Sequence, residues 1–373
     1  CATALLVAAG KRVGTYSSPH LMRYNERICI DGIPVADALI IDAFEAIDHA
    51  RGDVSLSYFE FATLAALWIF RAAQTEVAVL EVGLGGRLDA VNAVDATVAV
   101  VTRVALDHQQ WLGDTLDSIA TEKAGIVRDG RPVVLAESGY PQALYTVATQ
   151  RAAQLQRAGS EWHWRRCGVD SLEVTGPGSP PVRITLPAGL QPSNVAAALC
   201  AVQLLGFPLE SAPAERALGC LVFPGRQQHL HFKGLDVILD VAHNPDAAQA
   251  LAAHLGTLAA AETVAVVGVL ADTDIAGVIG PVAPHISGAV VCGLPGIARS
   301  LPAPDLAGAV AAAGVRVIAE ADTPARAWEL LWPTLATGSR VVVFGSFHTV
   351  GGIMPALRET GVAGDLEQTW TRR

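Results

Sequence analysis

Three polar residues that could bind a metal ion each follow an apolar segment of the sequence. They are Ser18, Glu81 and His108, and a glycine-rich segment follows Glu81. Oxygen ligands suit Mg²⁺, and an imidazole could serve as a further ligand. Each residue also has a structural alternative, which is a helix cap for Ser18, a solvated carboxylate for Glu81 and a strand cap for His108. The residue types alone leave both interpretations open.

A lysine and an arginine are further candidates for phosphate chemistry. Lys123 lies in a predicted helix beside Glu122, so its ordinary role would be a surface ion pair. Near a metal and phosphates, Lys123 could instead carry a carbamate, which would turn a cation into an anion that faces the metal. Arg226 follows a Pro-Gly pair, and its guanidinium suits a phosphate because it neutralises two oxygens together. A solvated arginine in a linker is the alternative.

An acidic and a basic residue stand close together in the C-terminal half. Asp240 and His243 lie where an apolar strand is predicted to give way to a helix. Side chains at such a junction point into the same crevice, and Asn244-Pro245 is a typical helix start. The pair therefore predicts a ligand site on the second half of the chain.

Short apolar runs alternate with helical stretches, and this pattern predicts the elements that position the candidate residues. Strands are expected at 13–16, 77–82, 97–101 and 132–135, and helices at 36–50, 59–73 and 116–126. Strands that are apolar on both faces and separated by helices indicate a buried, mostly parallel sheet. Ligands gather at the carboxyl ends of such strands. The pattern therefore predicts an α/β fold with its site at those ends.

The chain is expected to contain two domains, because its 373 residues exceed twice the roughly 150 residues of a typical domain. Short strands and turn-forming residues over 157–190 predict a small antiparallel excursion within the first domain. A second alternating series begins after the breaker cluster Phe223-Pro224-Gly225-Arg226. We therefore predict domains over residues 1–222 and 233–373, joined by a linker over 223–232.

Composition narrows the class of protein. With 51% apolar and 17% charged residues, the chain is expected to be packed and not disordered. Its net charge of −10 argues against a nucleic-acid-binding surface. The six scattered cysteines lack metal or disulfide spacing, and no apolar run reaches the roughly 18 residues of a membrane span. We therefore expect a cytoplasmic protein that binds neither nucleic acid nor membrane.

Motifs along nearly the whole chain resemble those of the dihydrofolate synthase/folylpolyglutamate synthase family, which is related to the Mur ligases. The matching segments are Tyr16-Ser17-Ser18-Pro19-His20-Leu21, Asn25-Glu26-Arg27, Phe59-Glu60 with Thr63, Leu80-Glu81-Val82-Gly83-Leu84-Gly85-Gly86-Arg87-Leu88-Asp89, Leu106-Asp107-His108, Glu122-Lys123-Ala124-Gly125-Ile126, Pro224-Gly225-Arg226, Asp240-Val241-Ala242-His243-Asn244-Pro245 and Gly345-Ser346-Phe347-His348. Their number and order exclude chance agreement. The resemblance implies a P-loop-type, mostly parallel sheet domain that binds ATP and folate, followed by a smaller Rossmann-like glutamate-ligase domain.

The resemblance also implies a reaction. In this family, ATP phosphorylates a pterin-linked carboxylate, and the amine of L-glutamate then displaces the phosphate. Dihydropteroate and reduced folates would be the acceptors, Mg²⁺ the metal, and a monomer the active form. Two alternatives remain, which are an enzyme restricted to polyglutamylation and a folate-binding protein that has lost catalysis. A Mur-type peptidoglycan ligase is disfavoured because residues 17–21 and 83–89 are folate-like.

Site residues are transferred from the family motif by motif. The resemblance implies that Mg²⁺ binds to Ser18, Glu81 and His108. Lys123 matches the lysine that is carbamylated in this family. The expected ATP contacts are Asn194, Arg226, Asp240 and His243, and the expected catalytic residues are Lys123, His108, Asp240 and His243. The expected folate contacts are Arg27, Gly85, Arg87 and Asp89.

One motif of the family is missing from the sequence. The phosphate-binding loop, which ends in Gly-Lys-Gly-Ser or Gly-Lys-Gly-Thr, does not occur among the 373 residues. Gly10-Lys11 is followed by arginine and ends a predicted helix. We expect that the loop precedes residue 1, and that the chain as given binds ATP poorly.

Overall fold

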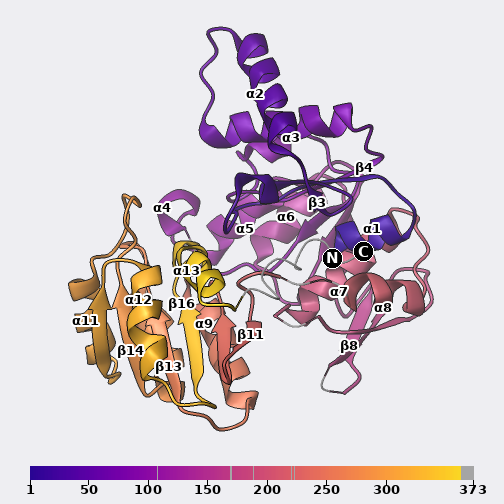
Figure 1. Cartoon of the computed structure of the whole chain (residues 1–373). Coiled ribbons are helices and arrows are strands. Elements are labelled where there is room, and N and C mark those ends of the chain that lie inside the picture. Colours follow the sequence, from indigo (N-terminus) through magenta and orange to yellow (C-terminus); the bar gives the residue numbers. More distant parts are fainter. Residues whose placement is uncertain (107, 169, 188, 220, 222, 363–373) are drawn as a thin grey trace. The chain divides into compact units, whose positions relative to one another are not determined.

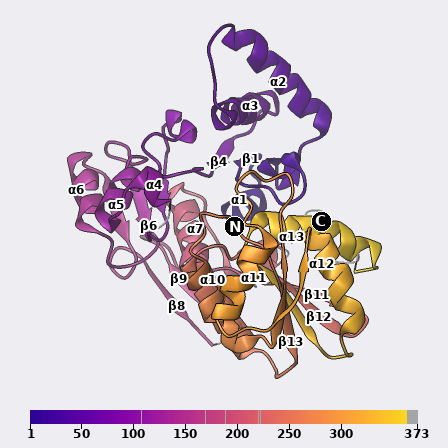
Figure 2. The same ribbon diagram turned by 90° about the vertical axis from the view of Figure 1, so that its left-hand side faces the viewer.

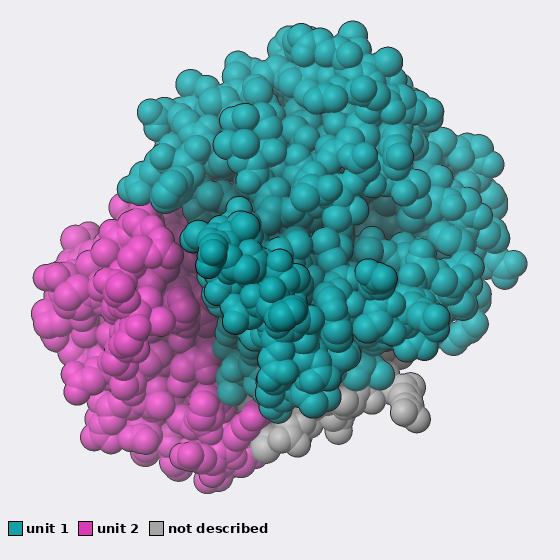
Figure 3. All heavy atoms as spheres, turned by 90° about the horizontal axis from the view of Figure 1, so that it is seen from above, with its two compact units in different colours: residues 1–221 teal, residues 222–373 magenta. Residues whose placement is uncertain are grey.

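The computed structural model describes residues 1–106, 108–168, 170–187, 189–219, 221 and 223–362. The chain divides into two compact units, residues 1–221 and 222–373 (Figures 1 and 3). Both units combine helices with sheets that contain parallel strands, which confirms the predicted α/β class. Asp107, which belongs to one of the family motifs, lies outside the described residues.

The described strands of the first unit form three small sheets. The first has the order β3-β2-β1-β4, with β1 (Val13–Tyr16), β2 (Ile28–Ile30), β3 (Ile33–Pro34) and β4 (Val77–Leu80). The second is parallel and contains β5 (Ala99–Val101), β6 (Pro132–Leu135) and β7 (Gln154–Arg157). The third is antiparallel and contains β8 (His163–Arg166), β9 (Ser171–Thr175) and β10 (Val182–Thr185). The third sheet confirms the predicted antiparallel excursion.

Helices of very different lengths accompany these sheets. They are α1 (Ala2–Ala8), α2 (Asp37–Arg51), α3 (Tyr58–Ala72), α4 (Gln109–Leu112), α5 (Leu116–Ala124), α6 (Gln142–Gln150), α7 (Pro192–Leu204) and α8 (Ser211–Gly219), with 3₁₀ turns at Tyr24–Arg27 and Ala90–Ala93. α7 carries apolar residues around most of its circumference, and a helix with this pattern is typically buried in the core. It packs against β5, β6, β9 and α1, and so it connects two of the sheets.

The pairing of β1 with β4 brings two predicted metal ligands to the same edge of a sheet. The strands run parallel, and Tyr16 is aligned with Leu80 at their last paired position. The backbone N–H of Glu81 then donates to the Tyr16 carbonyl at 2.9 Å. Because both strands end at this level, Ser18 and Glu81 leave the sheet side by side.

The second unit contains a six-stranded sheet with the order β11-β12-β16-β13-β14-β15. Its strands are β11 (Gln228–Phe232), β12 (Leu235–Leu239), β13 (Thr263–Val267), β14 (Gly288–Cys292), β15 (Val317–Ala321) and β16 (Arg340–Phe344). Its helices are α9 (Pro245–Thr257), α10 (Ile275–Val282), α11 (Ala303–Ala312), α12 (Pro324–Leu331) and α13 (Phe347–Glu359), with 3₁₀ turns at Ala283–His285 and Trp332–Thr334.

Helices cover both faces of this sheet. α9, α10 and α11 share an apolar core with one face, whereas α12 and α13 contact the central strands from the other side (Figure 2). Every described pair of neighbouring strands except β11–β12 is parallel, so the unit is doubly wound as predicted. Within the part of the chain that the structure describes, every helix is too short or too polar to span a bilayer.

The predicted linker over 223–232 is wrong for its last five residues. They form β11, which pairs antiparallel with β12. The two strands are joined by Lys233 and Gly234, which have φ values of 46° and 79°. A two-residue hairpin turn with positive φ values matches the twist of the flanking strands. The segment Gln-His-Leu-His-Phe was difficult to recognise as a strand because only two of its five residues are apolar, and Gln228 is buried on the same face as Leu230 and Phe232.

Candidate functional site

The first part of the candidate site lies where β1 and β4 end. The backbone N–H of Ser18 donates to Oε2 of Glu81 at 3.0 Å, so the structure brings these two residues together. The exposed carboxylate and the serine oxygen are the hard donors that Mg²⁺ prefers. Among the described residues, however, no three His, Cys, Asp or Glu side chains form a complete metal site. The donor types therefore fit a magnesium ion, and its binding here stays a prediction.

His108 lies at the start of α4, with a left-handed backbone conformation at φ 50°. α4 packs against the glycine-rich turn, which we define as residues 83–89. A Cβ atom added at Gly85 would lie only 2.8 Å from Cδ2 of Leu112 in this helix. The helix that His108 begins therefore contacts the turn that follows Glu81. That His108 and Glu81 bind the same ion stays a prediction.

The glycine-rich turn packs closely on α5. A Cβ at Gly86 would lie 3.1 Å from the carbonyl oxygen of Lys123, and a Cβ at Gly125 would lie 2.4 Å from the Cα of Arg87. Because the two backbones approach so closely, glycine is needed on both sides of this contact. The packing places Lys123 beside the glycine-rich turn.

Asp89 and Arg87 hold this turn in its conformation. The Asp89 carboxylate accepts hydrogen bonds from the N–H groups of Gly83 and Leu84, both at 3.0 Å. Arg87 forms a 3.0 Å ion pair with Glu122 of α5. Both residues therefore have a structural role that the sequence motif did not reveal, and their contact with folate stays a prediction.

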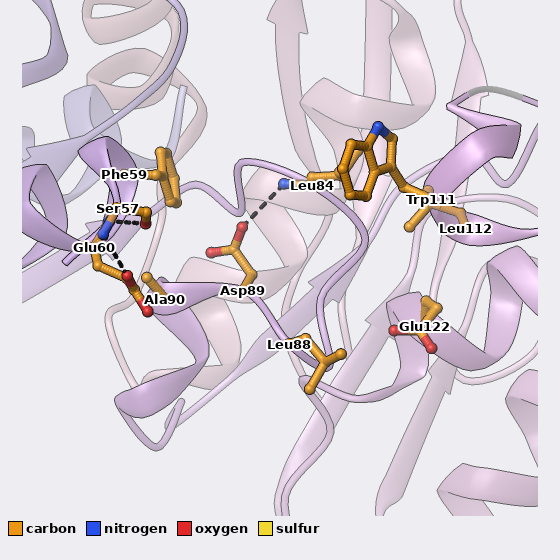
Figure 4. Close-up of a pocket in the computed structure, with 10 residues that line it drawn as sticks. All are labelled: Ser57, Phe59, Glu60, Leu84, Leu88, Asp89, Ala90, Trp111, Leu112 and Glu122. Atoms are coloured by element: carbon orange, nitrogen blue, oxygen red, sulfur yellow. Dashed lines mark hydrogen bonds between the residues drawn. The ribbon is translucent and has the colours of Figure 1, made fainter. Parts of the chain in front are cut away.

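A pocket of about 280 Å³ opens beside the glycine-rich turn (Figure 4). Figure 4 shows Phe59 and Trp111 on opposite sides of this pocket, with Asp89 between them. Two aromatic side chains with a carboxylate between them suit a flat, nitrogen-rich ring that can donate hydrogen bonds. Neither aromatic residue was predicted as a site residue. Phe59 belongs to a family motif, which was the one signal for it in the sequence. In the structure, Trp111 is 77% exposed although it is strongly apolar, and such exposure is typical of a binding site.

Arg27 lies in the same part of the first unit as this pocket. The rings of Tyr16 and Phe59 are 5.7 Å apart. Burial raises the pKa of the Tyr16 hydroxyl, while the charge of Arg27 lowers this pKa and that of Asp89 raises it. Nε of Arg27 also donates to Nδ1 of His20 at 2.8 Å. Arg27 and Asp89 therefore both lie close enough to Tyr16 to shift the pKa of its hydroxyl, in opposite directions.

In the second unit, two predicted nucleotide contacts meet at one aromatic ring. Phe347 begins α13, and two residues separate it from the end of β16. The Arg226 guanidinium lies 5.5 Å from the centre of this ring, and the His243 ring lies 5.8 Å from it. Phe347 belongs to a family motif, but sequence reasoning assigned it no role. The structure gives it one, because it fixes the positions of an arginine and a histidine at the carboxyl end of the sheet.

Asp240 lies beside these residues and is buried. It follows β12, and its N–H donates to the Val343 carbonyl of β16 at 2.9 Å. Its carboxylate accepts from the N–H groups of Gln227 at 3.1 Å and Ala242 at 2.8 Å. Burial raises the pKa of Asp240 to about 6, although these hydrogen bonds and the charge of Arg226 act in the opposite direction. A cationic partner would therefore stabilise the ionised form.

Asn194 lies in the first turn of α7 and is exposed. Its backbone N–H donates to the Gln191 carbonyl at 3.1 Å, at the start of the helix. The contact of Asn194 with adenine stays a prediction.

The described contacts thus bring Ser18 together with Glu81 in the first unit, and Arg226 together with His243 through Phe347 in the second.

Comparison with known proteins agrees with the motifs. The family described as Mur ligase, glutamate ligase domain, matches residues 225–347. The dihydrofolate synthase/folylpolyglutamate synthase of Escherichia coli (strain K12) is 39% identical over 357 residues, which cover 95% of this chain and 82% of that protein. The structure of E. coli FolC in complex with DHPP and ADP has a TM-score of 0.89 at 38% identity, over 96% of this chain and 84% of that chain. A bifunctional folylpolyglutamate synthase/dihydrofolate synthase with Mn, AMPPNP and L-glutamate bound has a TM-score of 0.86 at 39% identity, over 96% and 85% of the two chains. The chain therefore belongs to the dihydrofolate synthase/folylpolyglutamate synthase family of Mur-type ligases.

Proposed function

We propose that this protein is an ATP-dependent ligase that joins L-glutamate to dihydropteroate and then to reduced folates. The observation that carries the proposal is the oxygen-rich edge formed by Ser18 and Glu81, from which the glycine-rich turn leads to an aromatic pocket. The pocket suits a pteridine ring, and the edge suits a metal ion that neutralises phosphate. The bound molecules named for the related structures support both assignments.

Within this proposal, each residue of the first unit has a distinct task. Ser18, Glu81 and His108 would hold Mg²⁺, which supplies charge neutralisation for phosphoryl transfer. The Ser18 N–H fixes the orientation of the Glu81 carboxylate. Arg27, Gly85, Arg87 and Asp89 would position folate, either directly or by shaping the glycine-rich turn. The first unit would therefore be the catalytic domain that binds ATP and folate.

We also propose a carbamate on Lys123. It forms when the uncharged amine adds to CO₂ and releases a proton, which leaves an anion where a cation stood. Lys123 is half-buried and lies in the last turn of α5 against the glycine-rich turn, so an added anion would be held near the proposed metal. Native mass spectrometry with ATP, Mg²⁺ and bicarbonate is expected to show the modification and to lose it in Lys123→Arg. An unmodified Lys123 under these conditions would contradict this part of the proposal.

The second unit would act as the glutamate-ligase domain and contribute to nucleotide binding. Arg226 and His243 flank Phe347 at the carboxyl end of the sheet, and an arginine there can bind two phosphate oxygens. Asp240 would favour a cationic partner, and Asn194 of the first unit would contact adenine. A titration with ADP checks this assignment, because Arg226→Gln should weaken binding whereas the exposed Arg216→Gln should not.

Assays with two acceptors test the proposed function. The protein, with any sequence that precedes residue 1, is incubated with ATP, L-glutamate and either dihydropteroate or tetrahydrofolate. We expect ADP release that depends on glutamate with both acceptors. Turnover of tetrahydrofolate alone would instead indicate a folylpolyglutamate synthase, and folate binding without turnover would indicate a binding protein. Light scattering during size-exclusion chromatography checks the expected monomer.

A further inference from the structure

The sheet edge where Ser18 and Glu81 lie also carries an arginine. Arg27 directly precedes β2, whose first residue pairs with Tyr16, the last residue of the antiparallel strand β1. The backbone N–H of Ser17 then donates to the Arg27 carbonyl at 2.9 Å. Arg27 therefore lies beside the segment that leads to Ser18, at the end of β1 where the metal ion is proposed to bind.

The guanidinium of Arg27 is held by three neighbouring side chains. Its Nε donates to Nδ1 of His20 at 2.8 Å. Its Cζ lies 5.8 Å from the centre of the Tyr24 ring and 5.6 Å from the centre of the Tyr58 ring, and aromatic rings attract a cation at such distances. The two rings are inclined at 81° to each other, so they restrict the guanidinium from two directions. A half-buried arginine fixed in this way loses little freedom when it binds a ligand.

Arg27 has no acidic partner among the residues that the structure describes. The carboxylate of the adjacent Glu26 instead accepts from the backbone N–H groups of residues 21–23, at 2.7–2.9 Å. The hydrogen bond to His20 uses only Nε, so both terminal nitrogens of Arg27 keep their N–H groups for another acceptor. Because the planar fork of an arginine matches both oxygens of a carboxylate, Arg27 is suited to bind that group of a ligand.

Arg27 also lies close to the aromatic pocket. Tyr58, which contacts its guanidinium, begins α3 and is followed by Phe59 of the pocket wall. The ring of Tyr16, at the end of β1, lies 5.7 Å from the Phe59 ring. A carboxylate bound to Arg27 would therefore stay near both the pocket and the end of β1, where the reaction is proposed to take place.

We propose that Arg27 binds the α-carboxylate of the terminal glutamate of a folate acceptor, while the γ-carboxylate of that glutamate lies at the proposed metal site. This inference rests on the proposed function and names the group by which the site distinguishes its two acceptors. Dihydropteroate has one carboxylate, which is the one that reacts. A reduced folate has a reacting γ-carboxylate and, only a few bonds away, an α-carboxylate that does not react. Arg27 would therefore contribute mainly to the binding of folates, with Tyr24 and Tyr58 as its positioning residues.

An acceptor that lacks only the α-carboxylate tests this inference. Such an analogue is tetrahydrofolate with 4-aminobutyrate in place of glutamate, which keeps the chain length and the reacting carboxylate. The protein, with any sequence that precedes residue 1, is assayed with ATP and L-glutamate. We expect its kcat/KM for the analogue to be about 10- to 100-fold below that for tetrahydrofolate, as for the loss of a charged hydrogen bond. In Arg27→Gln the two acceptors should differ by less than about threefold, because the arginine that distinguishes them is gone.

Dihydropteroate and the tyrosine variants provide further readouts. Arg27→Gln is expected to lower kcat/KM for tetrahydrofolate about 10- to 100-fold more than that for dihydropteroate. Tyr58→Leu should lower the preference for tetrahydrofolate over the analogue about 2- to 5-fold, whereas Tyr58→Phe keeps the ring and should retain this preference. Arg23→Gln is the matched control, because Arg23 is 68% exposed and pairs with Asp37 at 2.9 Å.

The outcomes separate this inference from the proposed function. Equal kcat/KM for tetrahydrofolate and the analogue with the unaltered protein, or an equal loss for both in Arg27→Gln, would overturn the role of Arg27. If the unaltered protein turned over none of the acceptors, the proposed function would fail. Calorimetry would then compare the affinities of the unaltered protein for tetrahydrofolate and the analogue, which requires neither a variant nor turnover. Equal affinities would refute the inference, and a weaker affinity for the analogue would support it.

Discussion

Replacing Glu81 with glutamine is expected to lower the kcat of the ligase reaction by about 10²–10³-fold. The glutamine keeps the length of the side chain and an oxygen that can accept from the Ser18 N–H, so the ends of β1 and β4 should stay in place. The variant loses the negative charge, and a neutral amide is a much weaker partner for a hard divalent ion than a carboxylate. Phosphoryl transfer depends chiefly on such charge neutralisation, so the loss should appear in the chemical step.

Steady-state kinetics over a range of Mg²⁺ concentrations measure this effect. High Mg²⁺ should restore part of the activity, because the variant binds the ion weakly but keeps the site. Glu76→Gln is the matched control, since Glu76 is a carboxylate just before β4 whose exposed ion pair with Lys11 contributes little. If Glu81→Gln kept nearly full activity at limiting Mg²⁺, Glu81 would only order the turn at Ser18.

Several elements could be predicted from the sequence because a short run of apolar or β-branched residues was enough to identify each of them. β1 and β6 are short runs rich in β-branched residues, and their observed bounds agree with the predicted ranges 13–16 and 132–135. In these segments the local preference and the buried environment agree, so periodicity alone was sufficient.

Other elements depend on partners that are distant in the sequence. α4 has four residues, which is too short for a helical period to be visible. α13 contains two adjacent glycines and Pro355, all of which disfavour a helix. Its helical form is stabilised by tertiary packing, in which Gly352 lies so close to Pro324 that an added Cβ would be 3.0 Å from it. Propensity failed here because packing overrides it.

The candidate site was predictable to a similar extent. Ser18 and Glu81 meet because each follows a strand and the strands pair in parallel, and the sequence indicated both conditions. The aromatic pocket was not predictable, because it forms only when α4 packs on the glycine-rich turn and places Trp111 near Phe59. The role of Phe347 also required the structure, since it depends on the neighbouring positions of β12 and β16.

Replacing Gly125 with alanine is expected to destabilise the first unit by about 1–3 kcal/mol and to lower ligase activity. The backbone at Gly125 has φ −61° and ψ −14°, which alanine adopts without strain. The cost is instead steric, because the added Cβ would lie 2.4 Å from both Cα and Cβ of Arg87. Backbone atoms cannot rotate away as a flexible side chain can, so either α5 or the glycine-rich turn must shift. Either shift changes the position of Lys123 relative to that turn.

Gly308→Ala is the matched control for this substitution. Gly308 lies in α11 with no positive φ, and an added Cβ there would meet nothing within 4 Å. Alanine is therefore expected to stabilise that helix by about 0.5–1 kcal/mol, and denaturant unfolding of the two variants should show opposite signs. A loss of activity in Gly125→Ala with unchanged stability would mean that the turn moves without cost to the fold. Unchanged stability together with unchanged activity would mean that the close contact between Gly125 and Arg87 is not required, which would contradict the packing argument itself.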